Sequence, residues 1–62
     1  MNEAVKNEIE KQIKLINQNL EFVMNNELPT EELVKQEFGC IRILVDYCEK
    51  LVLEGESAIE EL

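Results

Sequence analysis

The chain lacks most of the features that hold a very small protein together. Its 62 residues include no histidine, no tryptophan, one proline, two glycines and two cysteines. A chain this short buries only about 60% of the surface that its unfolded form exposes, so it usually needs a disulfide, a metal or a partner. Cys40 and Cys48 would lie about 12 Å apart along one helix, which is too far for a disulfide within the chain.

The missing histidines also bear on metal binding. The chain has no Cys-x-x-Cys pair, and a metal site between bundle helices typically uses Glu-x-x-His. We therefore expect no metal and no cofactor. Self-association, or docking on another protein, is left as the expected stabiliser.

Long apolar runs are absent as well, since none exceeds three residues. A membrane-spanning helix needs about 20 apolar residues, and the first residues show no apolar core of a signal peptide. The hydrophobic content of 45% is nevertheless that of a folded chain. We expect a soluble, cytoplasmic protein with reduced thiols.

Basic residues are scarce, with 6 against 14 acids and a net charge of −8. Phosphate contacts need Lys or Arg, so we expect no direct nucleic-acid binding and no membrane binding. The acids gather near the middle and the end of the chain. Such a surface would suit a basic partner, but a charge run is more often a solvated face.

What the sequence does contain is two amphipathic helical patterns. In the first, apolar residues recur at steps of four, three, four and three from Ile9 to Val23, which marks one face of a helix. We predict a helix over about 3–25 that ends before Pro29, because the residue before proline is pushed out of the helical region. Its apolar face comprises Val5, Ile9, Ile13, Ile16, Leu20 and Val23.

A second helix is predicted over about 31–54, with Thr30 as its N-cap. Apolar residues fill four heptad positions: Val34, Ile41 and Cys48 at a, Leu44 and Leu51 at d, Phe38, Val45 and Val52 at e, and Leu33, Cys40 and Tyr47 at g. A two-stranded seam needs only a and d. This stripe spans about half of the helix, more than one partner helix can cover.

The end of the second helix has two interpretations. Gly55 is a favourable C-cap, and Ser57 with Glu60 has the spacing of a capping box, which predicts a short turn over 57–62. Gly55, Ala58, Ile59 and Leu62 also continue the heptad register. One uninterrupted helix is therefore the alternative.

These elements predict an all-α fold, an antiparallel helical hairpin forming one domain over 1–62. Residues whose numbers sum to about 57 should face each other: Val23 and Val34, Ile16 and Ile41, Ile13 and Leu44, and Ile9 and Cys48. The first helix carries a further apolar patch at Leu15 and Phe22.

A second copy would cover the surplus apolar surface and produce a four-helix bundle, while a helix of another protein is the competing occupant. The candidate dimer or partner interface comprises Leu33, Phe38, Cys40, Leu44, Val45, Tyr47, Leu51, Val52, Leu15 and Phe22.

Few residues suggest chemistry, and we assign no catalytic residue. Glu37 falls at a d position, where a buried acid would be perturbed unless it reaches water or a base. Cys48 and Cys40 lack the basic neighbours that activate a thiol. Tyr47, at the edge of the apolar stripe, is a residue type that often anchors interfaces. Gly39 sits at an outward position, where glycine weakens a helix.

Three functional hypotheses follow. The first is a non-enzymatic, regulatory interaction protein that self-associates and binds a partner protein. The second is an acidic mimic of nucleic acid that inhibits a basic DNA- or RNA-binding protein. The third is an enzyme, by analogy of length and shape with the helical-hairpin phosphatases of the bacterial sporulation phosphorelay, whose Ser-Gln-Glu-Leu-Asp signature has no counterpart in this chain. Richness in Ile, Lys, Asn and Glu suggests an AT-rich bacterial or phage genome.

Overall fold

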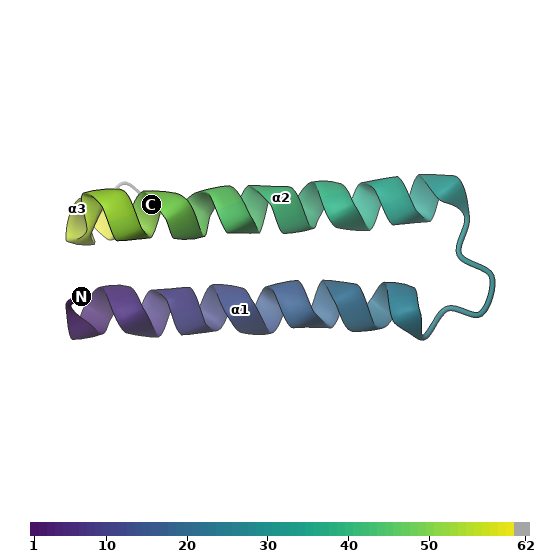
Figure 1. The fold of residues 1–62 in the computed structure, drawn as a ribbon, viewed down its shortest axis with the longest axis horizontal. Helices are drawn as coiled ribbons and strands as arrows, with labels where there is room; N and C mark the ends of the chain where they lie inside the picture. The colour runs from purple at the N-terminus through teal and green to yellow at the C-terminus, as the bar shows by residue number, and fades with distance from the viewer. Residues whose placement is uncertain (61–62) are drawn as a thin grey trace.

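The protein is a two-helix hairpin with a short third helix at its end (Figure 1). A computed structural model describes residues 1–60 and contains α1 (Glu3–Met24), α2 (Glu31–Glu54) and α3 (Glu56–Glu60), with no strand among those residues. α1 and α2 run antiparallel along their whole lengths and form a body of 41 × 16 × 15 Å. The predicted all-helical class and the two long helices are confirmed.

Side-chain caps fix where the long helices begin. The Thr30 hydroxyl oxygen accepts a hydrogen bond from the backbone N–H of Leu33 at 3.1 Å, so the predicted cap of α2 is confirmed. Asn2 caps α1 in the same way, since its Oδ1 accepts from the N–H of Val5 at 3.1 Å. In the loop, Asn26 Oδ1 accepts from the N–H of Leu28 at 3.3 Å.

Gly55 breaks the chain between α2 and α3. It has φ 66° and ψ −141°, a backbone conformation that essentially only glycine adopts. α2 therefore ends at Glu54, and the alternative of one uninterrupted helix is wrong. The predicted C-terminal turn forms as α3, although the last two residues of the predicted range lie outside the described residues.

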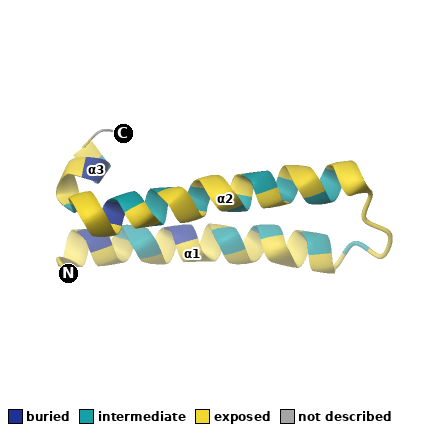
Figure 2. Cartoon of the chain, turned by 45° about the horizontal axis from the view of Figure 1, so that its top comes forward, coloured by how far each residue is buried: buried dark blue, intermediate teal, exposed yellow. Residues whose placement is uncertain are grey.

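α3 closes one end of the hairpin. Ala58 is buried together with Val5 and Leu51, and the partly buried Ile9, Tyr47 and Ile59 pack against these three. Asn2 Nδ2 also donates a hydrogen bond to Glu56 Oε1 at 2.6 Å, which connects the first residues to α3. Figure 2 shows the buried residues in the half of the hairpin that holds the N-terminus. The half near the loop is more open.

The seam between α1 and α2 differs from the prediction at two positions of α1. Ile13 and Leu20 were expected to face α2, but they are 48% and 38% exposed. Gln12, only 8% exposed, and the half-buried Asn19 take the interior positions. Either pair, Ile13 and Leu20 or Gln12 and Asn19, fits the alternating spacing of three and four residues expected of interior positions. A prediction from hydropathy alone therefore places the isoleucine and the leucine in the interior. The rotation of α1 in the structure instead turns the two amides inward.

Candidate interaction surface

Two strips of apolar side chains flank the seam, one on each face of the hairpin. Residues directly after interior positions project to one side of a helix, and residues directly before them project to the other. Two antiparallel helices are related by an approximate two-fold axis perpendicular to the plane that contains both. Rotation about this axis exchanges the two helices but does not exchange the two faces of the hairpin. In both helices, residues directly after an interior residue therefore lie on one face of the hairpin. Residues directly before an interior residue lie on the opposite face.

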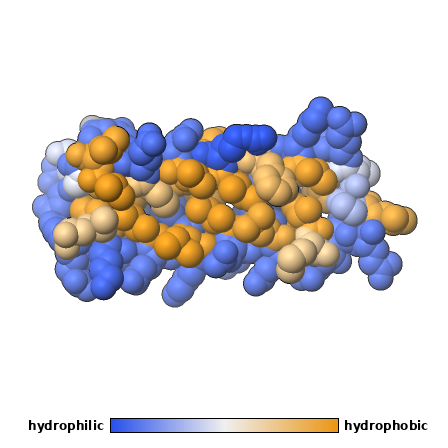
Figure 3. Space-filling model, viewed as in Figure 1, coloured by the Kyte–Doolittle hydropathy of each residue, from blue (hydrophilic) through white to orange (hydrophobic). Residues whose placement is uncertain are grey.

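The first strip, which we call flank 1, consists of Ile13, Leu20, Phe38, Val45 and Val52. All five are exposed, from 37% for Phe38 to 57% for Val52. Met24 lies four residues after Leu20 and extends the strip toward the loop. Figure 3 shows one face of the hairpin on which apolar surface runs along both helices, with hydrophilic residues on its two long edges.

The second strip, flank 2, consists of Leu15, Phe22, Leu33, Cys40 and Tyr47. Leu15, Phe22 and Cys40 are exposed, whereas Leu33 and Tyr47 are half-buried. Ile43, 69% exposed, adjoins this strip because it lies three residues after Cys40 and four before Tyr47. Flank 2 is interrupted near its terminal end by Glu8.

The predicted interface residues divide between these strips and the interior. Leu51 is completely buried and Leu44 is half-buried, so these two serve the seam of the hairpin itself. The other eight lie on the flanks. The sequence prediction lacked Ile13 and Leu20, which it had assigned to the interior. Their seven-residue spacing could not have placed them on a flank, because interior positions repeat every seven residues as well.

Polar groups in the seam are paired with each other. Asn19 Nδ2 donates to Glu37 Oε2 at 3.0 Å across the two helices, and Glu37 is half-buried. The acid at this predicted interior position therefore has an amide partner from α1. Within α1, Gln12 Nε2 donates to Glu8 Oε1 at 3.1 Å, and Glu8 also forms an ion pair with Lys11 at 3.6 Å.

Tyr47 is the exception to this pairing. Its hydroxyl oxygen is shielded from solvent and has no hydrogen-bond partner in the described chain. Burial raises the pKa of this phenol, and the negative charges of Glu8 and Cys48 raise it further, while Lys50 acts in the opposite direction. The neutral phenol is thus the form that the fold favours.

The two thiols have different surroundings. Cys40 is exposed on flank 2, while Cys48 is half-buried, and burial raises the pKa of the Cys48 thiol. A raised pKa lowers the fraction of reactive thiolate at neutral pH. Asp46, Tyr47, Cys48 and Glu49 are consecutive on α2 and so point in successive directions about 100° apart.

An open hollow lies at the first turn of α2, lined by the exposed residues Thr30, Glu31, Glu32 and Lys35. Within 1–60, no group of three His, Cys, Asp or Glu side chains is placed to hold a metal ion. None of the described helices is long and apolar enough to cross a membrane.

Comparison of the chain with protein-family models, with curated proteins and with solved structures finds no match.

Proposed function

We propose that this protein is a non-enzymatic, regulatory interaction protein that self-associates as a dimer of hairpins and binds a partner protein to modulate it. One apolar flank would pack against a second copy to form a four-helix bundle. The other flank, running along two helices, would receive an amphipathic helix of the partner.

The rotation of α1 is the observation that carries this proposal. Gln12 and Asn19 are turned inward, although a rotated α1 could bury Ile13 and Leu20 in their place. For an isolated hairpin this is the unfavourable choice, because burial of an apolar side chain contributes about 1.5–3 kcal/mol. For an assembled protein it is favourable, because Ile13 and Leu20 then join an interface.

The opposed flanks also support a protein with two interfaces. In a two-fold symmetric dimer, the same surface of each copy packs against its counterpart. A dimer formed through one flank therefore leaves the other flank uncovered. The remaining strip would stay on the outer surface of each copy. Exposed apolar surface of this kind usually marks an interaction site.

Self-association is tested by light scattering over a hundredfold range of concentration, with circular dichroism on the same samples. We expect a helical species of twice the 7.2 kDa chain mass. A helical species that keeps the monomer mass at every concentration would contradict the dimer.

Partner binding is tested with Leu15→Lys/Phe22→Lys, which places two charges on flank 2 alone. A protein captured by the wild type is identified, purified and titrated against both forms. We expect the variant to remain dimeric, to lose affinity and to lose its effect on the partner's activity. Equal affinity of the two forms would contradict this role of flank 2.

A further inference from the structure

We propose that the second copy packs on flank 1 in the antiparallel sense, with the loops at opposite ends of the bundle. The two-fold axis passes near Ile13 and Val45, perpendicular to the helices, so that Arg42 of each copy lies opposite Glu49 of the other. This inference rests on the proposed self-association and names its surface and its orientation.

Flank 1 is better suited to a second copy than flank 2. The line of flank 1 positions carries two charged residues, Lys6 and Glu31, at its two opposite ends, and the Glu31 side chain is 80% exposed. The corresponding line of flank 2 contains Glu8, whose side chain is 17% exposed, accepts a hydrogen bond from Gln12 and forms an ion pair with Lys11. A copy packed there would bury two such carboxylates, which is costly without further partners.

The size of the face is sufficient for a stable dimer. The whole hairpin extends 41 × 16 Å in the plane of its two helices, which corresponds to a projected face of about 650 Å² per copy, or about 1,300 Å² in a dimer. Stable interfaces bury about 1,200–2,000 Å² in total. The dimer would therefore need most of the length of flank 1, which requires an axis near the middle of the hairpin.

Ile13 and Val45 mark that middle. They lie at about the same level, because the cross-seam pair of Asn19 and Glu37 fixes the register of the two helices. Two symmetric arrangements then give full overlap. With the axis along the helices, α1 packs on α2 of the other copy and both loops lie at one end. With the axis across the helices, each helix packs antiparallel on its own counterpart.

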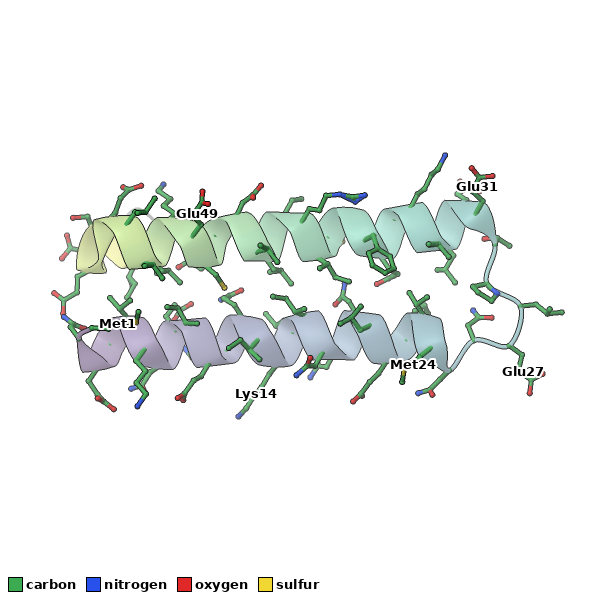
Figure 4. The ribbon with its side chains drawn as sticks, in the orientation of Figure 1. Met1, Lys14, Met24, Glu27, Glu31 and Glu49 are labelled. Atoms are coloured by element: carbon green, nitrogen blue, oxygen red, sulfur yellow. The ribbon has the colours of Figure 1, made fainter. Side chains whose placement is uncertain are left out.

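The charges along the edges of flank 1 distinguish the two arrangements. On the edge formed by α2, Arg42 lies nearer the loop and Glu49 nearer the termini, and Figure 4 shows Glu49 on the outer edge of α2. On the edge formed by α1, Asn17 and Glu10 occupy the corresponding levels.

With both loops at one end, Glu49 would face Glu10 of the second copy, twice in each dimer. With the loops at opposite ends, Arg42 would face Glu49, twice in each dimer, and Asn17 would face Glu10. Like charges repel and opposite charges attract across an interface rim. The edges therefore favour the antiparallel arrangement.

The variant Glu49→Arg gives opposite results in the two arrangements. In the antiparallel dimer it faces Arg42, and we expect the dimer Kd to rise by about tenfold. In the other arrangement it would face Glu10, and the Kd would fall. Arg42→Glu should also weaken the dimer, and Arg42→Glu/Glu49→Arg should restore it. Sedimentation equilibrium at low and high salt measures each Kd, and the differences should shrink at high salt.

A cross-linking experiment tests the geometry without changing charge. In a Cys40→Ser/Cys48→Ala background, Val45→Cys should oxidise readily to a covalent dimer, because residue 45 lies near its own counterpart. Ile13→Cys should do the same. If a covalent dimer forms only when Val45→Cys and Ile13→Cys are mixed, residue 13 lies near residue 45 of the other copy. α1 then packs on α2 of the other copy, and the antiparallel orientation is overturned. A wild type that stays monomeric overturns the proposed self-association itself.

Discussion

A single tyrosine gives the fold an optical probe of its own interior. Tyr47 is the only tyrosine in the chain, and the chain has no tryptophan, so phenolate absorbance reports this residue alone. Its hydroxyl is shielded and unpartnered, and burial raises its pKa above the ordinary value of 10.0. We expect the absorbance titration of the folded protein to have a midpoint above that of the denatured protein. Equal midpoints for the folded and the denatured protein would show that the Tyr47 hydroxyl is exposed to solvent.

The same pKa difference makes stability depend on pH in the alkaline range. The folded state keeps the phenol proton to a higher pH than the unfolded state, so this contribution is complete below pH 10 and is lost as pH rises through the folded pKa. We expect Tyr47→Phe to remove that part of the decline in the free energy of unfolding, measured by urea titration at several pH values. At neutral pH the variant should be at least as stable as the wild type, because the hydroxyl has no partner to lose.

The thiols should react at clearly different rates. Cys40 is exposed, whereas Cys48 is half-buried and its pKa is raised by burial. With a chromogenic disulfide reagent at neutral pH, we expect one fast and one slow thiol. Cys40→Ser should remove the fast phase and Cys48→Ala the slow one. Equal rates for both thiols would contradict the burial of Cys48.

At the scale of the elements, the two glycines should respond oppositely to alanine. Gly39 lies inside α2 with open space around an added Cβ, so Gly39→Ala should stabilise the protein by up to about 1 kcal/mol. Gly55 also has space, but its positive φ strains any side chain, so Gly55→Ala should destabilise by about 1–3 kcal/mol. Urea unfolding measures both. Equal effects would mean that α2 continues through Gly55.

The elements themselves were largely predictable from the sequence. Periodicity located both long helices, and Thr30 and Gly55 marked a start and an end of α2 through local backbone chemistry. The rotation of α1 was not predictable, because hydropathy places Ile13 inside while the structure places Gln12 there. Which side of a helix faces inward depends on the partner helix and on polar pairs such as that of Asn19 and Glu37. The spacing of apolar residues along one helix does not specify those contacts.

The candidate surface was predictable in part for the same reason. The predicted surplus of apolar residues on the second helix includes Phe38, Val45 and Val52, which are exposed in the hairpin, and their role in an interface stays a prediction. Leu51 belongs to the interior, where Val5 of α1 and Ala58 of α3 form one buried cluster with it. The sequence predicted a turn over 57–62, but it did not indicate which residues this turn would cover.

For the whole molecule, the distribution of packing implies that assembly contributes to stability. Among residues 1–60, the buried side chains lie in the terminal half, and the loop half holds exposed side chains such as Phe22 and Phe38. A hairpin with so small a core gains from any contact that covers its flanks. Dimer formation would extend the core along the full length of the helices.

The melting temperature should therefore rise with protein concentration. For a dimer, each tenfold increase in concentration adds about 1.4 kcal/mol, which corresponds to about 5 °C for an assembly of this size. Val45→Lys, on flank 1, should abolish both the dimer and this dependence. Ile43→Lys introduces the same charge two residues earlier, beside flank 2, and should leave both unchanged. Circular dichroism with light scattering measures each variant, and the reverse pattern would place the second copy on flank 2.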